Sequence, residues 1–289
     1  MWDFLREIGS ARYALWWAIG LWACDAFLTI LIIRRVPFTD VDWETYMVQV
    51  DAVLHGQFDY AQLRGPTGPI AYPAGFCWLY GLLRLSGAAV AQAQVVFAGL
   101  YMATLAVVFQ IYRQAGAPGW LLILCVLSKR VHSISHRPGG FVLRCFNDAA
   151  AQFLAYAALL LFLHRRRCLS LLAYSAAVSV KMQPLLFCPA VGLSLVLAGG
   201  WSLALPCVLA ALALQAAVAA PFLLVGPGAY LRHAFGGPGD LQHAWSVNWR
   251  AVPEDRSIPA RWIRPRADGH PRGSPALVRT FAMDTRGAA

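Results

Sequence analysis

The sequence predicts an all-α membrane protein, a polytopic bundle of transmembrane helices. Of its 289 residues, 59% are hydrophobic and only 13% are charged, whereas soluble domains carry about a quarter charged residues. Several apolar runs approach the roughly 20 residues that a helix needs to cross a bilayer. The composition therefore excludes an ordinary soluble domain and makes the lipid bilayer a partner.

The formal net charge of +10 does not indicate nucleic-acid binding. In a membrane protein, an excess of Lys and Arg is typical of cytosolic loops. The basic residues here lie between apolar runs and near the C-terminus, without the interleaved aromatic residues of a strand-binding groove. We expect no nucleic-acid partner.

The apolar runs define the expected elements in chain order. Residues 13–33 form the first predicted span and residues 94–112 the second. Between them, residues 70–85 are apolar but are broken by Gly, Pro and Arg, so we expect an interfacial or re-entrant helix that does not cross. Shorter runs follow at 120–134, 149–163, 169–180, 185–200 and 203–225. The first run lacks a small-residue cleavage site and is expected to be a retained anchor.

Basic residues predict the orientation of these helices. The run Arg165, Arg166 and Arg167 is the strongest cytosolic marker by the positive-inside rule. Counting spans in both directions from it places residues 40–42, 146–148, 181 and 245–250 on the opposite side. The polar clusters therefore gather on one face, although Arg34 and Arg35 fall on the side that the rule disfavours.

The seven cysteines lie inside or at the edges of apolar runs, and no two form a CxxC pair. We expect small buried hydrophobic residues rather than a zinc site or a disulfide framework. They are Cys24, Cys77, Cys125, Cys145, Cys168, Cys188 and Cys207.

An acidic pair follows the first span in a chain with only 14 acidic residues. Asp40 and Asp42 could hold a divalent cation against a diphosphate, or one could be the general base that deprotonates a sugar hydroxyl. A solvated loop end is the third possibility. Trp43 and Tyr46 could supply apolar walls and a sugar-stacking surface. Asp25, inside the first span, either faces neighbouring helices or supports this site.

Further polar clusters lie at predicted membrane edges. The Gly- and Pro-rich segment 65–75 is either a rigid connector or a loop whose backbone approaches a ligand. Cations at such edges suit a phosphate or extend to the interface, and aromatic and amide groups form a belt or face a carbohydrate. The residues concerned are Arg130, His132, Arg144, Asn147, Asp148, Lys181, Trp245, Asn248, Trp249 and Arg250.

Six phrases in order then identify a resemblance that covers about residues 1–250. They are VPFTDVDWETYM, FDYAQLRGPTGPIAYPAGF, SKRVHSI, FVLRCFNDAAA, AVSVKMQPLLF and WSVNWR. Together they resemble glycosyltransferase family 58, the dolichyl-phosphate-mannose-dependent α-1,3-mannosyltransferases of N-glycan assembly. The resemblance implies an endoplasmic-reticulum enzyme of the C-type glycosyltransferase (GT-C) fold with a lumenal site. A mannosyltransferase of glycolipid-anchor assembly is the alternative.

The resemblance also implies the substrates and the chemistry. Mannose would pass from dolichyl phosphate mannose to the dolichol-linked oligosaccharide Man5GlcNAc2-diphosphate-dolichol with inversion, which needs one general base. Asp42 is favoured as that base and Asp40 is its rival or orienting partner. Arg130, His132, Arg144 and Lys181 would contact phosphate, and the remaining residues of the polar clusters would contact sugar or line the site. No metal or cofactor is required.

Two segments depart from the family pattern. Residues 135–140 form a polar insert, and residues 251–289 contain no apolar run long enough to span a membrane. We expect a membrane-embedded mannosyltransferase domain at 1–250, with the catalytic motif in a lumenal loop at 36–93. A divergent, disordered tail is expected at 251–289. The expected chain is a C-terminally truncated, incomplete version of the fold, and an inactive fragment is the alternative to an active enzyme.

Overall fold

A computed structural model of the protein describes residues 13–38, 40, 42–127 and 142–236. Within these residues the chain is mostly helical, which confirms the all-α prediction. Three helical stretches in this part are long and apolar enough to cross a membrane. They are α2 (Ala14–Arg35), α5 (Val90–Gln114) and the stretch Gln183–Val225.

The remaining elements are shorter, and two very short strands form the one hairpin of the described residues. They are α3 (Trp43–Leu54), β1 (Arg64–Gly65), β2 (Gly68–Pro69), α4 (Ala74–Leu85), η2 (Gly119–Leu121), α6 (Leu122–Val126), α7 (Asp148–Leu163), α8 (Arg167–Val180), η3 (Gln183–Phe187), α9 (Cys188–Val225) and α10 (Pro227–Phe235).

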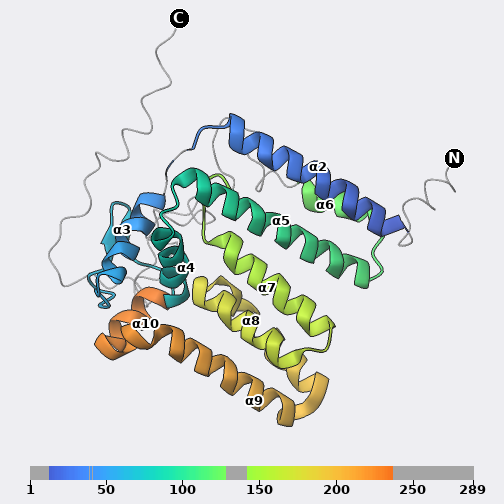
Figure 1. The fold of residues 1–289 in the computed structure, drawn as a ribbon. Helices are drawn as coiled ribbons and strands as arrows, with labels where there is room; N and C mark the ends of the chain where they lie inside the picture. Colours follow the sequence, from blue (N-terminus) through green and yellow to red (C-terminus); the bar gives the residue numbers. More distant parts are fainter. Residues whose placement is uncertain (1–12, 39, 41, 128–141, 237–289) are drawn as a thin grey trace, which may run out of the picture. The chain divides into compact units, whose positions relative to one another are not determined.

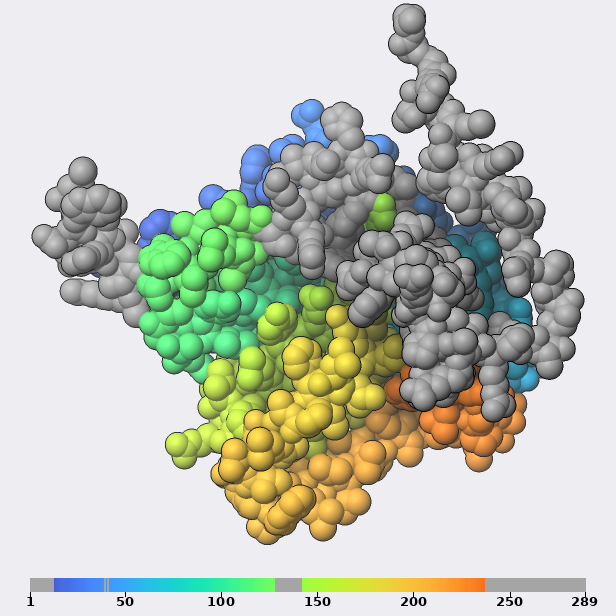
Figure 2. Space-filling view, turned by 180° about the vertical axis from the view of Figure 1, so that it is seen from behind, coloured from blue at the N-terminus to red at the C-terminus, as the bar shows by residue number. Residues whose placement is uncertain are grey.

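The long helices lie side by side in a simple order within residues 13–236 (Figure 1). Helix α2 packs on α5, α5 on α7, α7 on α8, and α8 on α9. The view from behind shows the same succession, from the green of α5 through yellow α8 to orange α9 (Figure 2). Helices α3 and α4 pack on each other, and α4 also contacts α8 and α9. One end of the bundle thus carries the short helices that follow the acidic pair.

The predicted spans agree with the observed helices. The run at 13–33 is α2, and the run at 94–112 is α5, which begins earlier and ends later. The interrupted run at 70–85 contains α4, whose 12 residues extend about 18 Å at 1.5 Å per residue. That length is well short of a hydrocarbon core of about 30 Å, so α4 fits the predicted interfacial helix.

The two predicted runs at 185–200 and 203–225 correspond to two halves of α9. The helix is interrupted at Gly199 and Gly200, where the backbone leaves helical geometry. Gly200 has a φ of 68°, a left-handed conformation that glycine adopts without a steric penalty. The break divides α9 into residues 188–198 and 201–225.

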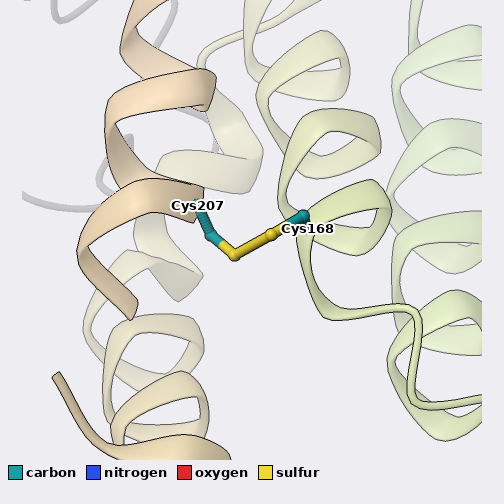
Figure 3. The surroundings of a disulfide bond; sticks show 2 residues. All are labelled: Cys168 and Cys207. Carbon is teal, nitrogen blue, oxygen red and sulfur yellow. A yellow bond between two sulfur atoms is a disulfide. The ribbon is translucent and has the colours of Figure 1, made fainter. Parts of the chain in front are cut away.

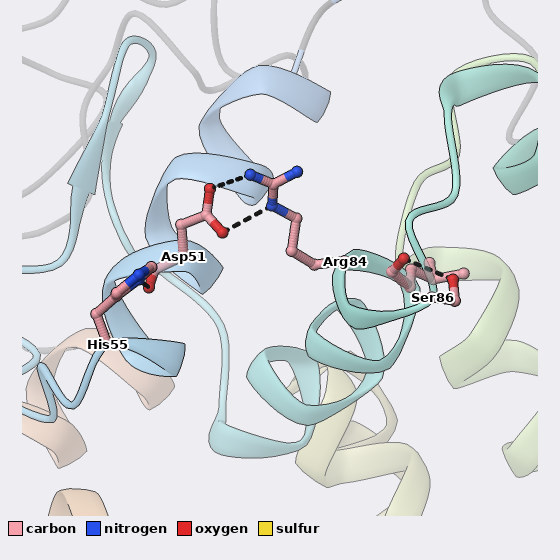
Figure 4. A network of polar contacts seen from close by, with 5 residues as sticks. Asp51, His55, Arg84 and Ser86 are labelled. Atoms are coloured by element: carbon pink, nitrogen blue, oxygen red, sulfur yellow. Dashed lines mark hydrogen bonds and ion pairs between the residues drawn. The ribbon is translucent and has the colours of Figure 1, made fainter.

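Helices α3 and α4 are held together by a buried aromatic cluster and an exposed ion pair. Tyr46 of α3 packs edge-on against Phe76 and Tyr80 of α4, with ring centroids about 5 Å apart. On the surface, the Arg84 guanidinium donates to both oxygens of the Asp51 carboxylate, at 2.7 and 2.8 Å (Figure 4). Exposed ion pairs of this kind contribute little to stability, so packing of the aromatic cluster contributes most of the stabilisation between the two helices.

The expectation that the cysteines form no disulfide is wrong for one pair. Cys168 of α8 and Cys207 of α9 are bonded, with Cα atoms 4.9 Å apart (Figure 3). The two residues are 39 positions apart in sequence, so no local spacing pattern could reveal them. Cys77 and Cys145 are buried as expected, whereas Cys24 and Cys188 are exposed, against that expectation.

Asp25 is buried in α2 and accepts a hydrogen bond from the Tyr101 hydroxyl of α5 at 2.5 Å. Of the two roles considered for Asp25, this contact supports the one in which it faces a neighbouring helix.

Candidate active site

Asp40 serves as a cap for helix α3. One of its carboxylate oxygens accepts the backbone N–H of Trp43 at 3.0 Å, and the other accepts that of Glu44 at 3.3 Å. The first N–H groups of a helix have no partner inside the helix, and a carboxylate at that end also meets the positive end of the helix dipole. Both oxygens of Asp40 are therefore occupied by backbone donors.

Asp42 lies two residues further along, directly before the first residue of α3, but its side chain makes no capping bond. One of its oxygens, Oδ1, accepts a hydrogen bond from the Thr67 hydroxyl at 3.4 Å. Burial raises the pKa of the Asp42 carboxyl above its ordinary value, and Asp40 raises it further. A carboxylate with a raised pKa binds a proton more readily, which is the property that a general base needs.

The hairpin of β1 and β2 holds Thr67 in place. Thr67 sits in the turn between the strands, and its backbone N–H donates to the Thr45 hydroxyl of α3 at 3.0 Å. A Cβ at Gly65 would lie 2.8 Å from the Cα of Thr45, so only glycine permits this close approach. The glycine- and proline-rich segment thus connects α3 to α4 and also orients the Thr67 hydroxyl toward the Asp42 carboxylate.

Two cations lie within electrostatic reach of Asp42. Arg144 and Lys181 both pull the pKa of Asp42 downward, against the effect of burial. Lys181 follows the last residue of α8, and its Nζ lies 2.6 Å from an Asp148 oxygen at the start of α7. The segment before α7 and the end of α8 therefore bring positive charge toward Asp42, at the start of α3.

The segment before α7 contains polar groups without partners. Asn147 is completely buried, and neither atom of its side-chain amide has a hydrogen-bond partner within the described residues. The same holds for the buried Nε of Arg144, whose guanidinium lies 5.9 Å from the Phe146 ring centroid. Buried polar groups are normally paired, so this segment retains unused hydrogen-bonding capacity close to Asp42.

Trp43 and Tyr46 are more buried than a sugar-stacking surface requires, at 8% and 2% exposure. The Tyr46 hydroxyl hydrogen-bonds the Tyr72 hydroxyl at 3.0 Å. Tyr72 is the half-buried member of this pair, and both Asp42 and Asp148 raise its pKa in addition to burial. Tyr72, which the sequence did not single out, is therefore a partly exposed aromatic residue within electrostatic reach of both carboxylates.

The structure brings together a subset of the predicted site residues, namely Asp40, Asp42, Trp43, Tyr46, Arg144, Asn147, Asp148 and Lys181. The other predicted contacts, Arg130, His132, Trp245, Asn248, Trp249 and Arg250, lie outside the described residues, as do the insert at 135–140 and the tail at 251–289. Thr67 was missed because only the folded hairpin reveals its contact with Asp42. Within the described chain, no group of three or more His, Cys, Asp or Glu side chains could hold a metal ion.

Comparison with known proteins gives a consistent set of relatives. The model of the family described as ALG3 protein matches residues 19–263. The chain is 42% identical over 259 residues to a Neurospora crassa protein named Dol-P-Man:Man(5)GlcNAc(2)-PP-Dol alpha-1,3-mannosyltransferase, with 88% of this chain and 57% of that protein covered. Proteins of the same name from Arabidopsis thaliana and Homo sapiens are 43% and 40% identical.

The alignments with those two proteins cover 82% and 86% of this chain, and 53% and 56% of theirs. The chain therefore spans about half the length of the curated relatives that it matches. No solved structure matches it. The family model covers most of the chain and the identities are well above 30%, and on this basis the chain belongs to the ALG3 protein family.

Proposed function

We propose that this chain carries the catalytic base of a mannosyltransferase that moves mannose from dolichyl phosphate mannose to Man5GlcNAc2-diphosphate-dolichol. The observation that carries the proposal is the half-buried carboxylate of Asp42, which faces two cations and has one oxygen engaged only by the Thr67 hydroxyl. The names of the relatives supply the donor and the acceptor.

The proposed reaction is a single displacement that inverts the anomeric centre. Asp42 takes the proton of the acceptor 3-hydroxyl while the oxygen of that hydroxyl bonds to C1 of the donor mannose. The bond from C1 to the phosphate oxygen breaks, and its electron pair leaves with dolichyl phosphate. The raised pKa of Asp42 favours the proton transfer.

The leaving phosphate gains negative charge as that bond breaks, and nearby cations stabilise such charge. Arg144 and Lys181 are the proposed contacts because both act electrostatically on Asp42. Asn147 and Asp148 are proposed to lie along the sugar path, and the unpaired amide of Asn147 offers both a donor and an acceptor. Arg130, His132 and residues 245–250 keep their predicted roles as phosphate or sugar contacts.

The architecture and location belong to the same proposal. We infer a GT-C fold in the membrane of the endoplasmic reticulum, with a catalytic domain at residues 1–250. Arg165–Arg167 lie at the end of α8 opposite Lys181, so the positive-inside rule would put Asp42 and Lys181 on the lumenal side. Dolichol-linked donor and acceptor would then reach the site from the bilayer.

The test is complementation of cells that accumulate the Man5GlcNAc2 lipid. We expect the chain to convert that lipid, Asp40→Asn to retain conversion, and Asp42→Asn to lose it by at least a hundredfold, since general base catalysis contributes about 10²–10⁴-fold. Asn is as good a helix cap as Asp, and its amide oxygen can keep one of the two capping bonds of Asp40, so we expect Asp40→Asn to retain α3.

Each other result has a definite meaning. Full activity of Asp42→Asn would exclude Asp42 as the base. A chain that fails to convert the lipid although it is present in the membrane would be the inactive fragment instead. Conversion of a glycolipid-anchor precursor in place of the Man5GlcNAc2 lipid would assign the other pathway.

A further inference from the structure

A pocket of about 540 Å³ lies beside the site, between the residues that precede α4 and the turn after α8. Two chain segments line it: Ala71 and Tyr72 before α4, and Lys181, Met182, Gln183, Leu185 and Leu186 after α8. This volume lies within the range of ordinary ligand sites, about 300–1,000 Å³. Among these lining residues, the Lys181 ammonium is the only charged group.

We propose that this pocket holds the first isoprene units of a polyisoprenyl monophosphate, with the phosphate on Lys181. The assignment rests on the proposed function and specifies where its lipid donor binds. An apolar chain that ends in one phosphate matches walls that are mostly apolar and carry one cation. Lys is well suited to phosphate as a compact point charge.

The position of the pocket in the fold agrees with a ligand that enters from the bilayer. Lys181 directly follows the last residue of α8, and the leucines lie in η3, where the next apolar stretch begins. Leu186 is 80% exposed and Leu185 is 45% exposed, so the apolar wall is open to the lipid side. A polyisoprenyl phosphate has the same arrangement, with its phosphate at the interface and its chain in the hydrocarbon core.

Tyr72 joins the pocket to the carboxylates. It lines the pocket, and its pKa responds to both Asp42 and Asp148. A phosphate on Lys181 would therefore lie at the same pocket as Tyr72, within electrostatic reach of Asp42, on which Lys181 already acts.

Donor and acceptor both carry a polyisoprenyl phosphate, so the chemistry of the pocket alone does not say which of them binds there. Its position next to Asp42 does. In an in-line displacement, the attacking hydroxyl and the leaving phosphate lie on opposite sides of one sugar carbon. The leaving phosphate is thus about one sugar away from the base. The acceptor's diphosphate, by contrast, is separated from the reacting mannose by the intervening mannose and GlcNAc units. The pocket next to Asp42 therefore fits the monophosphate donor.

Asp148 is a positioning residue in this arrangement. Its carboxylate holds the Lys181 Nζ at 2.6 Å, and both side chains are mostly buried. Lys has a long, flexible stem, and the ion pair restricts it to the edge of the pocket before the ligand arrives.

The first experiment is photocrosslinking with a polyisoprenyl monophosphate that carries a diazirine in its second isoprene unit, on the full chain in phospholipid vesicles. We expect the labelled peptide to contain residues 181–186, and dolichyl phosphate to compete. The proposal is overturned if the label lies elsewhere, or if dolichyl diphosphate or phosphatidic acid competes equally well. Neither result depends on mannose transfer, so labelling without transfer would leave the pocket assignment standing while the proposed function fails.

The second experiment measures the labelling yield of variants. Lys181→Met should reduce the yield about 10- to 100-fold, the effect of losing one charged hydrogen bond, and Lys181→Arg should restore most of it. Leu186→Gln should reduce the yield about fivefold by removing apolar contact. The matched control is Leu197→Gln in α9, because Leu197 is 78% exposed and does not line the pocket. Equal effects at positions 186 and 197 would overturn the proposal.

Discussion

Two aspartates one residue apart have different roles because of where α3 begins. Both carboxylate oxygens of Asp40 accept hydrogen bonds, from the backbone N–H groups of Trp43 and Glu44. Asp42 is held by a side-chain hydroxyl, and burial raises its pKa. At the scale of single residues, helix capping thus separates a structural acid from the acid that we propose as the base.

The Thr67 hydroxyl tunes the acid side of the pH profile. Its hydrogen bond lowers the pKa of Asp42 against the effect of burial, so removal of the hydroxyl raises that pKa. A base works only when deprotonated, so if Asp42 has the proposed role, activity is lost as the pH falls through its pKa. Thr67→Val should therefore move the acid limb of kcat/KM to higher pH.

The acid limb of the unmodified chain should itself lie above the ordinary aspartate pKa of about 3.9. The measurement is kcat/KM against pH, and Thr67→Ser is the control because it keeps the hydroxyl. An acid limb that stays in place in Thr67→Val would show that this hydrogen bond does not act on the base.

At the scale of elements, α4 is fixed by how closely its first turn approaches α8. A Cβ at Gly75 would lie 2.8 Å from the carbonyl carbon of Ser179, and backbone cannot move aside cheaply. Gly81 is in the same helix, but a Cβ there would lie 3.8 Å from its nearest neighbour, a side-chain atom of Leu54. Of the two glycines of α4, Gly75 thus has no room for a side chain, whereas Gly81 has room for a methyl group.

Gly75→Ala should destabilise the protein by about 1–3 kcal/mol, as overpacking does. Gly81→Ala is the matched control and should stabilise it by up to about 1 kcal/mol, because alanine favours helix over glycine. Thermal unfolding in detergent measures both. Equal changes at the two positions would show that the contact with Ser179 does not limit α4.

The elements were the predictable part of this protein, and the site was predictable only in composition. Apolar runs at 13–33 and 94–112 predicted α2 and α5 because a span needs only local hydrophobicity. The acidic pair and Lys181 were also visible as polar residues at the ends of apolar runs. Sequence could not show that Asp40 caps a helix or that Thr67 reaches Asp42, since these contacts depend on where α3 starts and on the hairpin turn.

At the scale of the whole molecule, the bundle is linked covalently between α8 and α9. Cys168 lies next to the basic run that predicts the cytosolic side, where disulfides are uncommon. The pair was not predicted, because its two residues meet only after α9 has turned at Gly199 and Gly200.

The disulfide should stabilise the chain by roughly 2–4 kcal/mol for a loop of this length. In thermal unfolding, a reductant should lower the Tm of the unmodified chain and leave the double variant Cys168→Ala/Cys207→Ala unchanged. Cys125→Ala is the control, since Cys125 is a free cysteine. Alkylation of both Cys168 and Cys207 without prior reduction would contradict the bond.

The contact between Gly75 and Ser179 has a genetic consequence. Ser179 is two residues before Lys181, and α4 packs on α3, whose first residue follows Asp42. A side chain at position 75 would push the two proposed halves of the reaction apart without touching either substrate. If variants were ranked by how much mannose transfer they lose, substitutions of Gly75 and of Asp42 would therefore rank together. The cause would differ, since a Gly75 variant alters the distance between α4 and α8 whereas an Asp42 variant lacks the proton acceptor.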